Sequence, residues 1–449
     1  MSGDLSLRQA LNGTQMSLIA IGGAVGTGLF LGSGFAVGLA GPSVLLSYAI
    51  GAVIALLLMI GLAEMVIVQP RAGNFGTFAS TYIGPTAGLL VNYAYLSANL
   101  LAIGTEATAV ALALRVWMPD VPTWVWVAAS AVSVVAVNIV TIRAFGVIES
   151  TFALIKIGAI LFFITLGVWY FVSAPPASNV GTHLLIADGG FFPNGLRGTW
   201  FAVVVTLFSY MGVELIAVTA AEAVDPRAAV LKAVRLTFAR LALFYLATLS
   251  VVLTIVPWRK IGTQVSPFVV VMEHAHLPSA AGLLNLVVLI AALSAMNSQL
   301  YGASRTVFGL AMAGQAPGFL KGVSRNGVPL PALTLAASGM AVAIGINAAM
   351  PEHALEIMIA LASFGAIFTW LMIFLSHIAF RRSKRTADAE ASIAGGRLSS
   401  YLGAVLVTAV LITTLFMPAF RLTVVCGIPL LIIVAALGRR HTRKAAVQK

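Results

Sequence analysis

The feature that most constrains this chain is a series of apolar runs, each about 20 residues long and broken by Gly, Pro or charged residues. A helix of that length, rising 1.5 Å per residue, crosses the ~30 Å hydrocarbon core of a bilayer. Only 9% of the residues are charged, against about a quarter in a typical soluble domain, which leaves too little polar side chain to cover a surface in water. The sequence therefore predicts an all-α polytopic membrane protein.

The apolar runs predict twelve transmembrane helices. Met417, Pro418 and Arg421 interrupt the last run, which favours a hairpin through the membrane over one continuous helix. The first 15 residues lack the features of a cleavable signal, so the first helix is expected to be retained. No tail or loop exceeds about 25 residues, so the activity is expected inside the bundle. The expected helices cover residues 16–40, 43–69, 85–116, 121–141, 146–173, 198–221, 234–256, 281–313, 331–349, 354–380, 400–418 and 419–438.

Positive charge is distributed unequally between the predicted loops. With both termini in the cytoplasm, twenty of the 26 Arg and Lys residues lie on the cytoplasmic side, five lie outside, and Lys156 falls within a helix. Cytoplasmic loops of membrane proteins carry such an excess, so this orientation is predicted. It also explains the net charge of +12 without a nucleic-acid partner, and none is expected. The cytoplasmic segments include the N-terminal segment 1–15, the loop 381–399 and the basic tail 439–449.

Residues that could support other functions are few. The single cysteine, Cys426, excludes an intrachain disulfide and a thiolate metal cluster. The six histidines show no metal-ligand spacing, and His274 and His276 lie in a predicted outside loop, where surface chemistry is favoured over a metal site. Rings of like side chains or filter loops, which would indicate a channel, are missing from the sequence. We therefore expect no metal, no cofactor and no enzymatic activity.

The first expected helix is unusually rich in glycine. Six glycines fall within Ile21–Gly34, and each costs about 1 kcal/mol relative to alanine in a helix interior. Close helix packing through small residues is one explanation. The other is a helix interrupted inside the membrane, whose free backbone N–H groups bind an anion such as a carboxylate. The sequence leaves both open.

A second interruption is predicted over 206–214, where Ser, Tyr and Gly occur together. This signal is weak alone, but if helices one to five and six to ten are inverted repeats, this segment corresponds to the glycine-rich one.

Ionisable residues within the membrane are the remaining candidate functional residues. Lys156 either snorkels to an interface or faces the bundle, where desolvation disfavours its charged form and makes reversible protonation plausible. Glu106 and Glu214 are either structural or functional carboxyls, and Glu64 and Glu222 are charge partners or gate elements.

These motifs together resemble those of bacterial amino acid permeases of the amino acid–polyamine–organocation superfamily. The resemblance covers residues 6–438, is carried by the combination of motifs, and does not separate substrates. Relatives often carry a Trp-rich sequence where this chain has Val91–Tyr95, so packing there is expected to differ. The matching segments are Ile21–Gly34 with Ala40–Pro42, Glu64–Pro70, Gly73–Phe75, Tyr82–Pro85, Trp117–Trp124, Phe208–Glu214, Glu222–Pro226, and Asn297–Ser298 with Tyr301 and Ser304–Arg305.

The resemblance implies a ten-helix core at 16–380, with inverted repeats at about 16–173 and 198–380, broken first and sixth helices, and two accessory helices at 400–438. Lys156 matches a lysine that replaces a sodium ion in proton-coupled relatives, so protons are the expected coupling ion and sodium is not. Arg305 joins Glu64, Glu214 and Glu222 in the set of candidate gate or structural charges. The substrate-binding residues it implies are Ala24, Val25, Gly26, Thr27 and Gly28 for the α-carboxylate, Ser209, Tyr210, Met211 and Gly212 for the α-amino group, Phe208 as an aromatic lid, and Glu106 beside the pocket.

The function implied is a secondary transporter in the bacterial cytoplasmic membrane that imports amino acids by proton symport with alternating access. An exchanger, a transport-dead nutrient sensor, and a transporter of a related amine such as GABA or polyamine remain alternatives. Glu106 could bind a cationic substrate, but the small and apolar residues at 102–106 and 209–213 favour a neutral or aromatic amino acid. The expected partners are the amino acid and the lipid bilayer, and the chain is expected to be a monomer or a weak homodimer.

Overall fold

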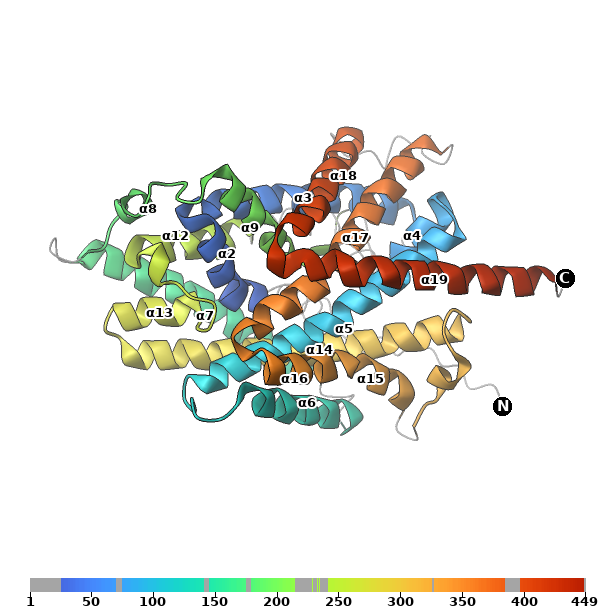
Figure 1. Cartoon of the computed structure of the whole chain (residues 1–449), viewed down its shortest axis with the longest axis horizontal. Helices are drawn as coiled ribbons and strands as arrows, with labels where there is room; N and C mark the ends of the chain where they lie inside the picture. Colours follow the sequence, from blue (N-terminus) through green and yellow to red (C-terminus); the bar gives the residue numbers. More distant parts are fainter. Residues whose placement is uncertain are drawn as a thin grey trace.

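The structure, a computed structural model, describes residues 26–69, 75–140, 145–174, 179–214, 228, 232, 234, 241–324, 327–383 and 396–447. All regular elements within these residues are helical (Figure 1). The long helices are α3 (Val44–Val68), α5 (Pro85–Arg115), α6 (Thr123–Val140), α7 (Phe145–Ser173), α9 (Gly195–Ser209), α14 (Pro278–Met312), α16 (Ser338–Ala349), α17 (Ala354–Arg382), α18 (Gly396–Thr413) and α19 (Arg421–Val447). The shorter ones are η1 (Gly28–Gly32), α2 (Ser33–Ala40), η2 (Gly41–Ser43), α4 (Phe75–Tyr82), α8 (Leu184–Ala187), η4 (Leu241–Ala247), α12 (Thr248–Ile255), η5 (Trp258–Lys260), α13 (Pro267–His274), η6 (Gly318–Lys321), α15 (Leu330–Ala336), η7 (Pro351–His353), η10 (Thr414–Phe416) and η11 (Pro418–Phe420).

Eight helical stretches in the described chain are long and apolar enough to cross a bilayer. The first of them, Gly28–Val68, contains both α2 and α3. The two helices meet at Gly41, where φ is +63°. Shorter apolar helices occupy Thr123–Ile139, Gly195–Ser209 and Leu243–Ile255. The chain is therefore a multi-pass helical membrane protein. The other long stretches are Pro85–Arg115, Thr151–Ser173, Pro278–Met312, Leu330–Ala349, Pro351–Arg382, Leu398–Phe416 and Pro418–Gly438.

Helix α5 lies at the centre of the bundle and packs against α14, α16 and α17 (Figure 1). Glycines allow the backbones to approach closely at these crossings. A Cβ at Gly339 of α16 would lie 1.7 Å from the carbonyl oxygen of Leu100, and one at Gly365 of α17 would lie 2.0 Å from that of Ala94. Packing through small residues holds helices together in lipid, where the hydrophobic effect between them is lost.

A second tight crossing joins α3 to α9. The hydroxyl groups of Ser43 and Thr199 lie 2.6 Å apart, and Ser47 donates to the Thr199 carbonyl at 2.7 Å. A Cβ at Gly51 would lie 2.3 Å from the Thr206 hydroxyl oxygen. Helix α2 also packs along α9, so the first span and the carboxyl end of α9 are brought together.

Some helix ends differ from the sequence prediction. Helix α9 ends at Ser209, within the predicted interruption and well before residue 221. The helix predicted to end at residue 438 continues as α19 to Val447, and η10 and η11 separate it from α18. Hydropathy marks where the membrane ends, whereas a helix can continue into water, and this accounts for the second difference.

Candidate functional site

Two chain segments far apart in sequence meet where α9 ends. The Ser209 hydroxyl donates to the Gly28 carbonyl at 2.9 Å. A Cβ at Gly28 would lie only 2.5 Å from the Ser209 Cα atom, so the two backbones touch and leave no room for a side chain. Gly26 is not helical, and the helical path begins with Thr27 and the π-turn η1. The glycine-rich segment thus faces Ser209 with a π-helical turn rather than with a regular α-helix.

Helix α9 ends at Ser209, with Tyr210 as its C-cap and a tight turn at Gly212. Gly212 has a φ of +94°, a left-handed conformation that glycine adopts readily. The Met211 N–H donates to the Phe208 carbonyl at 3.2 Å, and the Gly212 N–H donates to a carboxylate oxygen of Glu214 at 3.0 Å. The chain therefore leaves the helix inside the protein, where Phe208 and Ser209 are both buried.

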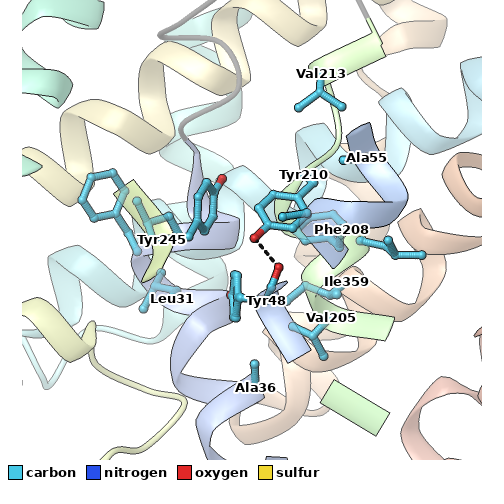
Figure 2. Packing of buried hydrophobic residues seen from close by; sticks show 14 of the residues in the cluster. Leu31, Ala36, Tyr48, Ala55, Val205, Phe208, Tyr210, Val213, Tyr245 and Ile359 are labelled. Carbon is cyan, nitrogen blue, oxygen red and sulfur yellow. Dashed lines mark hydrogen bonds between the residues drawn. The ribbon is translucent and has the colours of Figure 1, made fainter. Parts of the chain in front are cut away.

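Three tyrosines pack around the end of α9: Tyr48 on α3, Tyr245 on η4, and Tyr210 in the turn directly after α9. Tyr48, Tyr210 and Tyr245 are fully buried with ring centroids 4.8 to 5.8 Å apart (Figure 2). The Tyr245 hydroxyl donates to the Ser209 carbonyl at 2.7 Å, and the Tyr210 hydroxyl donates to the Tyr48 carbonyl at 2.9 Å. The Tyr48 and Ser209 hydroxyls lie 3.2 Å apart. The cluster thus fixes Ser209 through both its side chain and its backbone.

Tyr245→Phe tests this positioning. The variant keeps the ring and its packing but removes the donor to the Ser209 carbonyl, an interaction worth about 1 kcal/mol. We expect a three- to tenfold rise in the KM of transport with little change in the maximal rate. Tyr170→Phe, which alters a half-buried tyrosine on α7, serves as the control. An unchanged KM in Tyr245→Phe would show that the hydroxyl does not position the site.

An acidic group and a basic group are buried beside the irregular segment. Glu106 on α5 is 4% exposed, and its Oε1 atom would lie 3.0 Å from a Cβ at Gly26. Lys156 on α7 is completely buried and close enough to Glu106 for an electrostatic interaction. Thr27 lies close enough to stabilise the Glu106 carboxylate through its hydroxyl and backbone N–H, but neither Glu106 Oε2 nor the Thr27 hydroxyl makes a hydrogen bond of good geometry. A buried polar atom without a well-formed hydrogen bond is a position where a ligand or water can bind.

Glu214 has a structural position. Its carboxylate accepts the Gly212 N–H and also the indole N–H of Trp370 on α17 at 3.2 Å. The Tyr95 hydroxyl on α5 lies 3.4 Å from its other oxygen. The carboxylate thus connects the end of α9 to two helices of the bundle, which favours the structural interpretation of this residue.

Glu64 belongs to a separate buried cluster. His377 Nε2 lies 2.6 Å from one carboxylate oxygen of Glu64, and Arg381 forms an ion pair with the other. The second ring nitrogen of His377 lies 2.6 Å from the Ser400 hydroxyl. Because a carboxylate only accepts, His377 donates to Glu64 through Nε2–H. The cluster joins α3, α17 and α18 at one end of the bundle.

Arg381→Gln tests the contribution of the ion pair to stability. Removing one partner of a fully buried pair costs about 3–5 kcal/mol. Arg381 is 19% exposed and His377 still donates to Glu64, so we expect a smaller loss of about 2 kcal/mol. Thermal unfolding in detergent should show a midpoint several degrees lower. Arg382→Gln, which removes an exposed hydrogen bond to Tyr401, should shift it by less than a third as much. Equal shifts would contradict a specific role for Arg381.

The other predicted residues lie apart or outside the described residues. The Arg305 guanidinium stacks 3.4 Å from the ring centroid of Tyr301 on the same helix. Burial, Lys260 and His276 lower the pKa of His274, and within the described chain no three His, Cys, Asp or Glu side chains could share a metal ion. Ala24, Val25 and Glu222 lie outside the residues that the structure describes.

Sequence reasoning missed Tyr48, Tyr245 and His377. Each is a polar side chain within an otherwise apolar run, and that was the signal that could have identified it. Trp370, the partner of Glu214, gave a weaker signal because tryptophan is common in membrane helices. Their partners lie on other helices, so spacing along the sequence does not reveal the contacts.

A helical bundle in which α9 ends inside the protein beside buried ionisable groups defines a polytopic protein with a polar site in its interior. Comparison with known proteins identifies the family. Residues 15–448 match the family model described as Amino acid permease, so the chain belongs to this family of the amino acid–polyamine–organocation superfamily. It is 36% identical to the uncharacterized amino acid permease YtnA of Bacillus subtilis (strain 168), covering 94% of this chain and 92% of YtnA. It is also 36% identical to the aromatic amino acid transport protein AroP of Escherichia coli (strain K12), covering 98% of this chain and 96% of AroP.

Proposed function

We propose that this protein imports an amino acid across the bacterial cytoplasmic membrane by proton symport with alternating access. The observation that carries this proposal is the contact between Gly28 and Ser209, which brings the π-helical turn η1 and the end of α9 together beside the buried Glu106. Irregular backbone inside a membrane is tolerated only where it is buried in protein or lines a cavity. Membership of the amino acid permease family supports amino acid transport.

In the proposed site, backbone N–H groups bind the α-carboxylate of the amino acid, and backbone carbonyls bind its α-amino group. The N–H groups of residues 24–28 bind the α-carboxylate, because the start of a helix carries positive charge and free donors. Carbonyls near Ser209 to Gly212 accept from the α-amino group. Phe208, at the end of α9, closes over the substrate as a lid.

Lys156 and Glu106 couple transport to protons in this proposal. The Lys156 ammonium is buried near Glu106, and a fixed cation at that position removes the need for sodium, which would compete for the same oxygens. Loss of the lysine proton toward the cytoplasm would then accompany release of the substrate. Burial favours this cycle because it disfavours the charged form and keeps both protonation states accessible.

The same proposal includes the topology. Twelve spans with both termini in the cytoplasm agree with the distribution of positive charge. Residues 16–173 and 198–380 form the two inverted repeats, and α18 and α19 are the accessory helices. We propose that the protein acts as a monomer or a weak homodimer.

The proposed substrate is a neutral or aromatic amino acid. Residues 102–106 of α5, which end at Glu106, are small or apolar apart from one threonine and the glutamate. The relative AroP is named as an aromatic amino acid transport protein and matches almost the whole chain. Both observations favour an apolar substrate side chain over a cationic one.

Uptake by the purified protein in liposomes tests this function. A pooled mixture of radiolabelled amino acids is supplied with an inward proton gradient and without sodium, and empty liposomes are the control. We expect accumulation that a protonophore abolishes and that unlabelled phenylalanine, tyrosine or tryptophan reduces more than arginine does. Exchange without net accumulation would instead identify an exchanger. Binding without any flux would identify a sensor.

A further inference from the structure

A cavity outside the proposed substrate site opens where α5 begins and α14 ends. Its volume is about 150 Å³, roughly five times the share of one water molecule in the liquid. Leu89, Val434 and Leu437 give it apolar walls, and Tyr93, Gln315 and Gly438 complete it. At the polar end, the Tyr93 hydroxyl donates to the Gln315 carbonyl at 2.6 Å. The cavity is thus a built pocket with an apolar and a polar part.

Helix α19, which forms one wall, leaves an apolar face uncovered by protein. Val425, Ile432 and Ile433 are 61%, 63% and 57% exposed, and Leu437 at the mouth of the cavity is 52% exposed. Only 22% of the apolar part of this helix is buried within the protein. Lipid chains therefore have a continuous apolar path along α19 to the cavity.

The same helix becomes basic directly after the cavity. Its apolar part ends at Gly438, but the helix continues for nine residues to Val447, about 13 Å at 1.5 Å per residue. Figure 1 shows this end of α19 projecting beyond the neighbouring helices. The extension contains Arg439, Arg440, Arg443 and Lys444. Four positively charged residues thus follow directly on the apolar part of this helix in the sequence.

We propose that the cavity and the basic extension of α19 form a binding site for an anionic phospholipid. One acyl chain lies on the exposed face of α19 and enters the cavity beside Leu89 and Leu437. The phosphate lies near Arg439 and Arg440. Each Lys or Arg near an anionic membrane surface contributes about 1 kcal/mol, so several together select anionic from zwitterionic lipid. The site requires neither a substrate nor a proton gradient.

Native mass spectrometry of the full chain in detergent tests the site. Dioleoyl phosphatidylglycerol and dioleoyl phosphatidylcholine, which share acyl chains and differ in charge, are added at equal concentration. We expect at least fivefold preference for phosphatidylglycerol. Arg439→Gln/Arg440→Gln should reduce its retention at least threefold by removing charge, and Leu437→Trp should reduce it by filling the mouth of the cavity.

Control variants distinguish the proposed lipid from other possible occupants of the cavity. Lys384→Gln/Arg385→Gln removes two charges from the loop before α18 and should leave retention unchanged. Equal losses in both double variants would overturn the proposal, as would displacement of the lipid by soluble glycerol phosphate, which would indicate a simple phosphate site. A protein that is dimeric without lipid and becomes monomeric in Leu437→Trp would show that a second copy covers this face. The charge variants lie on a projecting helix end, so they test the site even if Leu437→Trp does not fold.

Discussion

Gly28→Ala should reduce amino acid uptake at least 100-fold in protein that still inserts and folds. The added Cβ would lie 2.5 Å from the Ser209 Cα atom, and backbone cannot yield as a side chain can. Helices η1 and α9 must then separate by about an ångström, a displacement that can cost 10²-fold when a bound group must be held in place. Initial rates of radiolabelled uptake at equal amounts of inserted protein measure the effect.

Two other glycines of the same span are matched controls. A Cβ at Gly26 would lie 3.0 Å from the side-chain oxygen of Glu106 and 3.8 Å from the Ala295 Cβ atom, and one at Gly38 would meet nothing within 4 Å. We expect about a tenfold loss in Gly26→Ala, because the carboxyl can shift. Gly38→Ala should retain wild-type uptake. Equal activity in Gly28→Ala and Gly38→Ala would show that the contact with Ser209 is not part of the site.

Lys156→Met should abolish uphill uptake while leaving exchange of substrate across the membrane. The variant keeps a long apolar stem in a fully buried position but removes the group proposed to carry the proton. In liposomes with an inward proton gradient, we expect the ratio of internal to external substrate to fall from well above one to one. Counterflow of labelled substrate into preloaded liposomes should persist.

Lys321→Met is the control for this experiment. Lys321 ends the short helix η6 and is exposed, so its loss should not change the accumulation ratio. A wild-type ratio in Lys156→Met would contradict the coupling role. Loss of exchange as well as accumulation would mean that the lysine is needed for substrate binding.

The sequence predicted the membrane class because it depends on local composition. Glycine is costly in a helix, so its concentration before residue 34 left close packing and an interrupted helix both open. In the described part of this segment, Gly26 is not helical and Gly28–Gly32 form a π-helical turn. An interruption near Ser209 was predicted from Ser, Tyr and Gly together, and α9 ends at Ser209, with Gly212 in the turn that follows.

Contacts between distant helices could not be predicted in the same way. Glu64 was a candidate gate or structural charge, but its partner Arg381 lies 317 positions later in the chain. The donor to the Ser209 carbonyl, Tyr245, comes from a segment where the sequence offered only an apolar run. Such pairs form when tertiary packing places two polar outliers together, and one sequence identifies the outliers without pairing them.

The proposed function requires that an amino acid binds between the segment at Gly26 to Gly28 and the end of α9. Its most direct test is a cryo-electron microscopy structure of the protein in a lipid nanodisc with the substrate identified by uptake competition. We expect density for the α-carboxylate at the backbone N–H groups before Gly28 and for the α-amino group near Ser209, with the side chain toward Glu106. Substrate density elsewhere, with this site filled only by protein, would contradict the account.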